Sequence, residues 1–229
     1  MNVALVIMVK QPAPGHVKTR LCPPLTPEQA AELYRCFLLD KMAQVRRVPV
    51  AAPYLAFTPE VAQGFFRDLA GESFILVPQE GRDLGERLDQ LSQRLLAAGH
   101  PGVVIIDSDT PSLPDRYLIE AVERTGDRGT DAVFGPAEDG GYYLVGLRRP
   151  SPALFQGITW STAVVLEQTL GKAAAAGLRV HLLPPWFDVD TGNDLKRLAD
   201  DLVRNGRPAQ HTRAFLQHLT VGRPGGHPS

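Results

Sequence analysis

Three permanent cations lie close together near the start of the chain. Lys10, Lys18 and Arg20 fall within eleven residues and share that segment with Gly15. A glycine-containing loop of this kind can turn backbone amides and side chains toward an anion, and a di- or triphosphate fits best. The segment lacks the spacing of a Walker loop and the G-x-G-x-x-G of a dinucleotide site. The alternative is a basic loop that only faces solvent.

Two carboxylates follow a short apolar run in the middle of the chain. Asp107 and Asp109 come directly after residues Val103–Ile106. Acidic groups are costly to bury without a partner, so a cation is expected beside them. Mg²⁺ or Mn²⁺ is suited to this position, because one or two carboxylates hold such ions together with phosphates and water. In the alternative, Asp109 or Ser112 caps the next helix, which leaves Asp107 unexplained.

A second acidic pair precedes two glycines. Glu138 and Asp139 stand directly before Gly140 and Gly141. Asp-Gly is a strong hairpin signal, so a tight turn accounts for part of this pattern. A turn does not require Glu138, and a carboxylate in this segment can act as a general base toward an acceptor hydroxyl.

Two further segments carry polar groups late in the chain. Asp188 and Asp190 point to the same side if their segment is extended. One of them is a candidate for a second metal-facing carboxylate, whereas Asp190 or Thr191 is a candidate cap for the last long helix. Trp160 precedes two hydroxyl residues that can cap a helix, and it either lines an acceptor pocket or fills the core.

A glycine-containing bend follows the third predicted strand. Residues Gln79–Arg87 include Gly81 and Gly85. Glycine has no Cβ, so the backbone there can approach a flat base or a ribose closely. Gly85 alone fits an ordinary turn equally well.

Alternating strands and helices must position these groups. The predicted strands are Val3–Val9, Val50–Phe57, Phe74–Val77, Val103–Ile106, Ala132–Gly135, Tyr142–Leu147 and Leu178–Leu183. The predicted helices are one from Thr26, then Pro59–Leu69, Gly85–Ala98, Pro114–Arg124, Thr162–Ala176, Thr191–Val203 and Pro208–Leu219. This alternation predicts an α/β fold with a single Rossmann-like, mostly parallel sheet and helices on both faces. Ligands of such sheets bind at the carboxyl ends of the strands.

The domain prediction follows from the same pattern. We expect one domain over residues 1–219 and a flexible, Gly/Pro-rich tail over residues 220–229. The first helix has a clear start, because Thr26, Pro27 and Gln29 form a capping box with proline at the first helical position.

Composition excludes several classes of protein. The 229 residues include 24 Lys and Arg against 25 Asp and Glu, so the chain lacks the positive surplus that nucleic-acid or anionic-membrane binding needs. Cys22 and Cys36 are too few to staple the fold, and free thiols suit a reducing compartment. The first residues lack the features of a secretion signal, and no apolar run reaches membrane-spanning length. We therefore expect a cytoplasmic protein that binds neither nucleic acid nor membranes.

The order of these segments resembles a glycosyltransferase-A-like family that some classifications call arsenosugar-biosynthesis glycosyltransferases. The matching segments span nearly the whole chain and are Lys10–Leu21, Gln79–Arg87, Asp109–Pro111, Gly135–Tyr143, Trp160–Thr162 and Asp188–Thr191. A fainter resemblance extends to molybdenum-cofactor and phospholactate guanylyltransferases. Relatives often carry glycine where this chain has Asp107, which makes Asp109 the safer metal ligand.

The resemblance implies a nucleotide-diphospho-sugar transferase fold and a metal-dependent glycosyltransferase with a small-molecule acceptor. It implies roles for four groups of residues: diphosphate and nucleotide binding by Lys10, Gly15, Lys18, Arg20, Gln79 and Gly81; metal binding by Asp109 with Asp107 or Asp188; acceptor activation by Glu138 or Asp139; and acceptor binding by Gly140, Gly141, Tyr142 and Trp160. The alternatives are a nucleotidyltransferase that releases pyrophosphate from an NTP, and a non-catalytic nucleotide-binding protein. The base, the sugar, the acceptor and the oligomeric state stay open.

Overall fold

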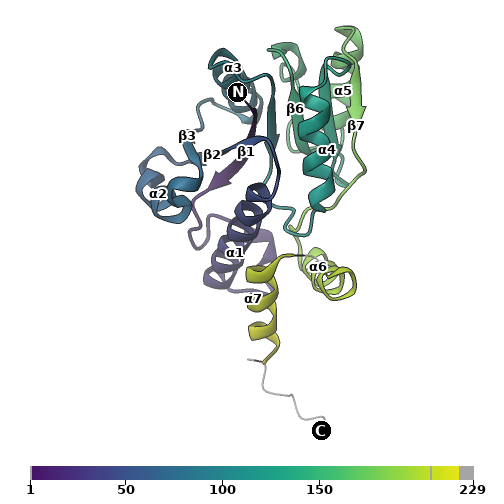
Figure 1. The fold of residues 1–229 in the computed structure, drawn as a ribbon. Helices are drawn as coiled ribbons and strands as arrows, with labels where there is room; N and C mark the ends of the chain where they lie inside the picture. Colours follow the sequence, from purple (N-terminus) through teal and green to yellow (C-terminus); the bar gives the residue numbers. More distant parts are fainter. Residues whose placement is uncertain (1, 207, 222–229) are drawn as a thin grey trace.

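Seven strands form one sheet in the computed structural model, which describes residues 2–206 and 208–221. The strands are β1 (Val3–Lys10), β2 (Ala51–Thr58), β3 (Ile75–Pro78), β4 (Val103–Ile106), β5 (Ala132–Pro136), β6 (Tyr142–Leu147) and β7 (Val180–Leu182). Their order across the sheet is β3-β2-β1-β4-β6-β5-β7 (Figure 1). Only β6 runs antiparallel to its neighbours β4 and β5 among the described strands, so the predicted mostly parallel sheet is confirmed.

The strand order creates a crevice beside β1. After β1 the chain adds β2 and β3 on one side and then crosses back to add β4 on the other side. The loops that leave the carboxyl ends of β1 and β4 therefore diverge, which is the usual ligand position in an open α/β sheet.

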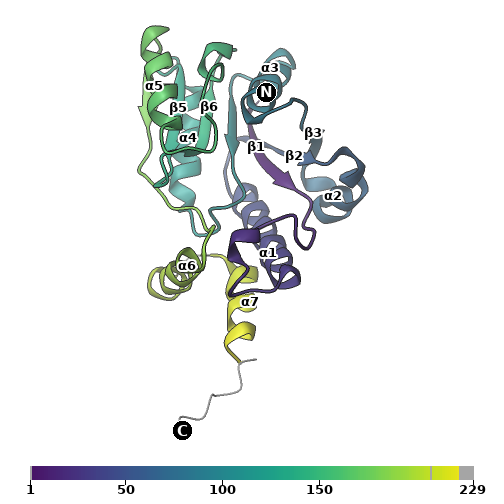
Figure 2. The same ribbon diagram turned by 180° about the vertical axis from the view of Figure 1, so that it is seen from behind.

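Helices cover both faces of the sheet. They are α1 (Pro27–Arg46), α2 (Gln63–Ala70), α3 (Leu84–Ala97), α4 (Asp115–Gly126), α5 (Val165–Ala175), α6 (Gly192–Asn205) and α7 (Gln210–Val221). Buried side chains of α3 and α5 form one core cluster with the sheet, whereas those of α1, α2 and α4 form another. Helices α6 and α7 lie beyond the carboxyl end of β1, where α7 packs against α1 and α6 packs against α7 (Figures 1 and 2).

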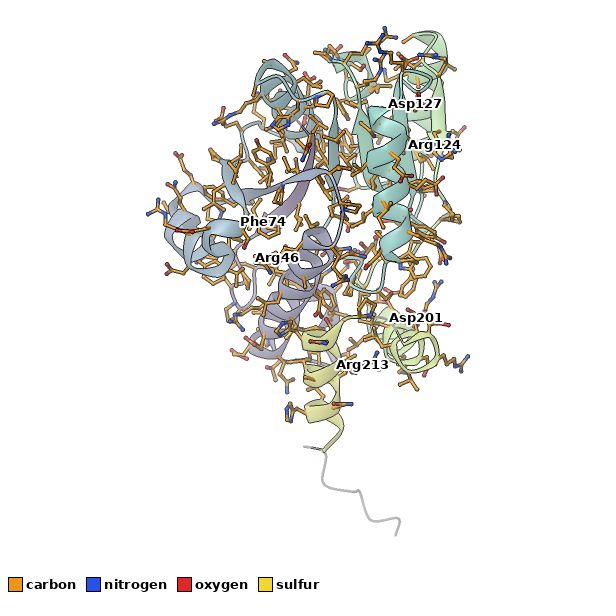
Figure 3. The ribbon with its side chains drawn as sticks, in the orientation of Figure 1. Arg46, Phe74, Arg124, Asp127, Asp201 and Arg213 are labelled. Atoms are coloured by element: carbon orange, nitrogen blue, oxygen red, sulfur yellow. The ribbon has the colours of Figure 1, made fainter. Side chains whose placement is uncertain are left out.

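Helix α1 begins where its sequence predicts. The Thr26 hydroxyl accepts the Gln29 backbone N–H, and the Gln29 side chain accepts the Thr26 backbone N–H, which completes the capping box. The apolar positions spaced three and four residues apart are all buried: Ala30, Tyr34, Leu38, Met42 and Val45. At its other end, the Arg46 guanidinium lies over the Phe74 ring, 5.2 Å from its centroid (Figure 3).

Two local expectations differ from the structure. Helix α5 begins at Val165 rather than at Thr162, because the Thr162 hydroxyl donates to the Thr159 carbonyl instead of capping the helix. The helix expected over residues 208–219 runs to Val221, so the first two positions of the predicted flexible tail are helical. Residues 222–229, the rest of that predicted tail, lie outside the described residues.

Among the described residues, no helix has both the length and the apolar composition of a membrane span.

The two cysteines, Cys22 and Cys36, are both free thiols.

Asp40 of α1 fixes the start of α7. Its carboxylate is 3% exposed and accepts the backbone N–H groups of His211 at 3.0 Å and Thr212 at 2.8 Å. These donors belong to the first turn of α7, which has no carbonyl partner for them within the helix. One buried aspartate therefore docks the C-terminal helix onto α1.

We expect Asp40→Ala to lower the free energy of unfolding by about 2 kcal/mol, because it leaves the buried Thr212 N–H and the partly buried His211 N–H without an acceptor. Urea denaturation measures the loss. Asp68→Ala removes an exposed aspartate of α2 and should change the stability by less than about 0.5 kcal/mol. Equal stabilities of the two variants would contradict the docking role of Asp40.

Candidate functional site

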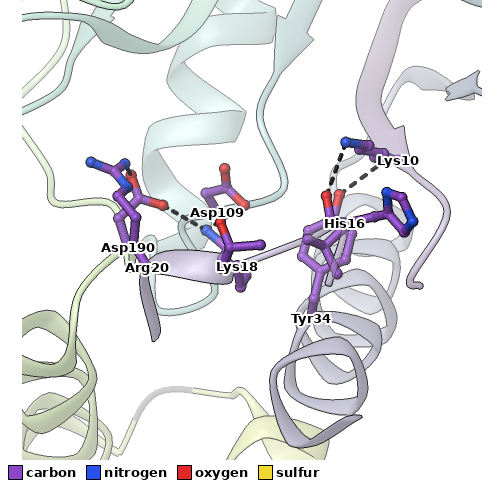
Figure 4. Close-up of a pocket in the computed structure, with 9 residues that line it drawn as sticks. Lys10, His16, Lys18, Arg20, Tyr34, Asp109 and Asp190 are labelled. Atoms are coloured by element: carbon purple, nitrogen blue, oxygen red, sulfur yellow. Dashed lines mark hydrogen bonds and ion pairs between the residues drawn. The ribbon is translucent and has the colours of Figure 1, made fainter. Parts of the chain in front are cut away.

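A pocket of about 240 Å³ opens at the carboxyl ends of β1 and β4. Its walls come from the loop after β1, from Tyr34 of α1, and from the loops that carry Asp109 and Asp190 (Figure 4). The pocket thus combines three of the segments that the sequence singles out. It also includes His16 and Tyr34, which sequence reasoning did not assign to a site.

Lys18 links the two acidic loops to the loop after β1. Its ammonium lies 2.7 Å from Asp109 Oδ1, 3.0 Å from Asp190 Oδ1 and 2.8 Å from the Val189 carbonyl oxygen. An ammonium has three hydrogens, so these three oxygens use all of them. Burial by itself lowers the pKa of Lys18, but the carboxylates of Asp109 and Asp190 more than offset this and raise it above its ordinary value.

This geometry changes the expected role of Lys18. Its side chain is 5% exposed and its hydrogens are occupied, so in this state it is an internal counter-ion rather than a free phosphate ligand. It also supplies the cation beside Asp109 that the sequence assigned to a metal, and the Asp109 side chain itself stays 39% exposed. The acidic loop is neutralised in part by the basic loop itself.

Arg20 and Lys10 remain accessible to an anion. The Arg20 side chain is 69% exposed, and Asp190 is the one described carboxylate with which it pairs. The exposed Lys10 ammonium donates to the His16 carbonyl at 2.9 Å, and no described carboxylate pairs with it. Gly15 adopts a φ of +75° in the intervening loop, a conformation that glycine takes without strain.

Tyr34 joins the floor of the pocket to the loop after β4. Its hydroxyl accepts the Lys10 backbone N–H at 3.1 Å and lies 2.8 Å from the Ser108 hydroxyl. Burial raises the pKa of Tyr34 to about 12, so the phenol stays neutral at physiological pH. The sequence predicts that Tyr34 is buried, because it lies on the apolar face of α1. It does not predict the contacts with Lys10 and Ser108.

Asp107 and Asp188 form a second group, beside the pocket. Their carboxyl groups interact directly, and Asp188 Oδ1 is buried without a hydrogen-bond partner. Burial raises the pKa of both groups, and for Asp188 the charges of Asp107 and Asp109 raise it further. Two carboxylates in contact hold a proton or a cation between them.

This pair fits a divalent metal that uses substrate oxygens as further ligands. No three acidic, histidine or cysteine side chains converge as a metal cage within residues 2–206 and 208–221. Mg²⁺ does not need such a cage, because one or two carboxylates hold it with phosphates and water. Asp107 and Asp188, with one orphaned oxygen, meet this requirement better than Asp109, whose carboxylate is bonded to Lys18.

The two expected general bases differ in their surroundings. Glu138 forms a two-point ion pair with Arg197, at 2.5 and 2.8 Å, and this pairing lowers the pKa of Glu138. Asp139 is exposed and uses Oδ1 to accept the Gly141 N–H at 2.9 Å, which closes the predicted turn. Glu138 is therefore occupied, whereas Asp139 keeps one oxygen free of described partners.

The expected acceptor residues pack beside this turn rather than in the pocket. Gly140 has a φ of +93°, and a Cβ there would meet the Ala163 carbonyl oxygen at 2.1 Å. Tyr142 and Trp160 pack edge to face, with ring centroids 6.4 Å apart. None of the four residues Gly140, Gly141, Tyr142 and Trp160 lines the pocket around Lys18.

The expected nucleotide-binding bend also lies outside that pocket. Gln79 donates through its side-chain amide to the carbonyls of Val9 at 3.0 Å and Ala56 at 2.7 Å, which ties it to β1 and β2. Gly81 has a φ of +132°, and a Cβ there would meet the Arg87 nitrogen at 2.7 Å. The glycine is thus required by the turn before α3, whatever else binds there.

Thr191 rather than Asp190 caps α6. The Thr191 hydroxyl accepts the Asp194 backbone N–H, and the Asp194 carboxylate accepts that of Thr191. Asp190 is consequently free to pair with Lys18 and Arg20. The sequence left these two roles open, and the structure separates them.

The fold and the crevice define an α/β protein of the nucleotide-diphospho-sugar transferase type. The chain belongs to the family described as "Uncharacterized protein conserved in bacteria (DUF2064)", whose profile matches residues 41–162. No curated protein matches the sequence.

Solved structures agree with this placement. A protein of Desulfovibrio desulfuricans G20, described as a "putative nucleotide-diphospho-sugar transferase", is 34% identical, with 96% of each chain covered and a TM-score of 0.90. A cytidylyltransferase of Leptospira borgpetersenii shares the fold at 10% identity, covering 99% of this chain and 100% of its own, with a TM-score of 0.56. The 4-diphosphocytidyl-2C-methyl-D-erythritol synthase of Anaerococcus prevotii does so at 9% identity, covering 94% and 96%, with a TM-score of 0.57.

We expect Lys18→Met to lower the free energy of unfolding by about 2–3 kcal/mol, because it removes the cation that Asp109 and Asp190 share. The value lies below that of a fully buried pair, since both carboxylates are partly exposed. Urea denaturation measures it. Lys10→Met, which removes an exposed ammonium of the same loop, should cost less than about 0.5 kcal/mol. A similar loss in both variants would show that Lys18 is not the link described.

Proposed function

We propose that this protein is a metal-dependent transferase that moves a sugar from a nucleotide diphosphate sugar to a small-molecule acceptor. The observation that carries the proposal is the pocket at the carboxyl ends of β1 and β4, where two accessible cations, Lys10 and Arg20, lie with the carboxylates of Asp109 and Asp190. The 34% identical Desulfovibrio protein, described as a "putative nucleotide-diphospho-sugar transferase", supports the same class of donor.

Lys10 and Arg20 are proposed to bind the donor's diphosphate. A departing diphosphate gains negative charge in the transition state, and fixed cations stabilise it there more than in the ground state. A nucleotide sugar carries one charge on each phosphate, which two cations match. Because Lys18 is held by Asp109 and Asp190, the loop offers fewer free cations than a triphosphate would call for.

Asp107 and Asp188 are the residues that would hold Mg²⁺ or Mn²⁺. When bound, such an ion supplies Lewis-acid stabilisation of charge on phosphate oxygens. Asp109 would orient Lys18 in this arrangement, which departs from the expectation that Asp109 is the principal ligand.

Asp139 is proposed as the general base for the acceptor hydroxyl. Asp139 is exposed and has one carboxylate oxygen without a described partner, so it can accept a proton. Glu138 fits this role less well, because Arg197 holds both of its oxygens.

Nucleotidyl transfer from an NTP is the second candidate. It is favoured by one feature of the loop, since a Lys18 released from its carboxylates would bring a third cation to a triphosphate. The two reactions differ in product, namely a nucleoside diphosphate or pyrophosphate.

The decisive experiment incubates the protein with a panel of sugar nucleotides and NTPs, with Mn²⁺ or with EDTA, and identifies the products. We expect a nucleoside diphosphate from one sugar nucleotide, lost with EDTA and restored by metal. Pyrophosphate from an NTP would establish the second candidate instead. Thermal stabilisation by nucleotides without any product would contradict both and indicate a binding protein.

We expect Arg20→Gln to raise the KM for the sugar nucleotide about 10- to 100-fold, because one charge-assisted hydrogen bond to the diphosphate is lost. Steady-state kinetics measure the change. Arg67→Gln, at an exposed position of α2, is the matched control and should leave the KM unchanged. An unchanged KM in Arg20→Gln would place the diphosphate elsewhere.

We expect Asp139→Asn to lower kcat about 10²- to 10⁴-fold, the usual contribution of a general base. Asparagine keeps the oxygen that accepts the Gly141 N–H, so the turn should survive. Glu138→Gln should lower kcat less than about tenfold by comparison. Rates at saturating donor and acceptor decide between them, and a larger loss in Glu138→Gln would reverse the assignment.

A further inference from the structure

A second lysine is buried beneath the acidic loop after β4. Lys41 of α1 is 1% exposed and donates to the Thr110 carbonyl at 2.7 Å, the Thr110 hydroxyl at 2.9 Å and the Gln44 side-chain oxygen at 3.1 Å. Burying an ammonium is costly unless its hydrogens are bonded, and here all three are. No role proposed above uses this charge.

The contacts of Lys41 fix the direction of the Thr110 hydroxyl. An ammonium only donates, so Thr110 Oγ1 must accept from Lys41 and send its own hydrogen elsewhere. That hydrogen goes to Asp107 Oδ1, which lies 2.8 Å away. Lys41, Thr110 and Asp107 therefore form a one-way relay of hydrogen bonds.

The relay determines which oxygen Asp107 can offer. Its Oδ1 also accepts the Asp109 backbone N–H at 3.2 Å, so that atom receives two donors. The other oxygen, Oδ2, receives neither and is the atom available to Asp188 or to a cation. Thr110 is itself 1% exposed, so water has little access to compete for its hydroxyl.

Gln44 anchors the relay on the helix. Its side-chain nitrogen donates to the Leu113 carbonyl and to Asp115 Oδ1, which leaves its oxygen to receive Lys41. Hydrogen bonds to both the nitrogen and the oxygen therefore fix the orientation of the Gln44 side-chain amide. A rigid helix, rather than the loop itself, determines how the loop presents Asp107.

We propose that Lys41 and Thr110 are positioning residues that orient Asp107 toward a divalent cation held with Asp188. This inference rests on the metal assignment of the proposed function. In this arrangement Lys41 and Thr110 do not touch the metal. They orient one of its ligands, and groups of this kind change the affinity of a site for its metal.

The test compares Thr110→Val with Thr110→Ser. Valine keeps the shape of threonine but has no hydroxyl, whereas serine keeps the hydroxyl that bonds Asp107. We expect Thr110→Val to bind Mn²⁺ at least about tenfold more weakly than the unchanged protein, and Thr110→Ser to bind within about threefold of it. Electron paramagnetic resonance titration with Mn²⁺ alone measures the affinity.

Lys41→Met tests the origin of the relay through a double-mutant cycle. Removing the ammonium also alters the local charge, but this effect is common to both arms of the cycle. In the Lys41→Met background, Thr110→Val should change Mn²⁺ affinity by less than about threefold, because the hydroxyl is no longer directed at Asp107. The Thr110 pair alone decides the proposal if Lys41→Met does not fold.

The outcomes separate this inference from the proposed function. If the unchanged protein does not bind Mn²⁺, the metal assignment fails and the relay has no cation to serve. If the unchanged protein binds Mn²⁺ and Thr110→Val binds it equally well, the relay is refuted while the metal assignment stands. If Thr110→Val weakens Mn²⁺ binding as much in the Lys41→Met protein as in the unchanged protein, Thr110 remains the positioning residue and the role of Lys41 is refuted.

Discussion

The ammonium of Lys18 and its three oxygen acceptors hold the whole crevice together. The acceptors belong to the loop after β4 and to the segment before α6, whereas Lys18 belongs to the loop after β1. Three chain segments that diverge from the sheet are thereby joined at one buried charge. Without that charge, Asp109 and Asp190 would lose the ammonium that both of them contact.

Two lysines make the density of carboxylates at this edge tolerable. Lys18 neutralises Asp109 from the pocket side, and Lys41 lies on the opposite side of the same loop. The carboxyls that neither lysine bonds directly, those of Asp107 and Asp188, are left in contact with each other. Among the described groups of the site, this pair is therefore the place where we propose a cation, in preference to Asp109.

The sheet topology explains why these groups meet. β1 lies between β2 and β4, and the chain changes direction across the sheet at this point, so the loops after β1 and β4 open a crevice rather than close over it. β4 and β5 both run antiparallel to β6, so the turn with Glu138 and Asp139, which follows β5, lies at the same edge as the loop after β4. Proteins with different reactions share this architecture, so the fold by itself does not choose the reaction.

Local sequence determined the strands, the start of α1 and the edge of the sheet where polar groups gather. The capping box at Thr26 and the apolar strand Val103–Ile106 depend on neighbours a few residues away, so the sequence predicts both of them. Tertiary structure alone decided which charge meets which: Lys18 with Asp109 and Asp190, Glu138 with Arg197, Asp40 with the start of α7. The reason is physical, because a charge accepts any opposite charge within reach, and only the packing of helices and strands determines which one is within reach.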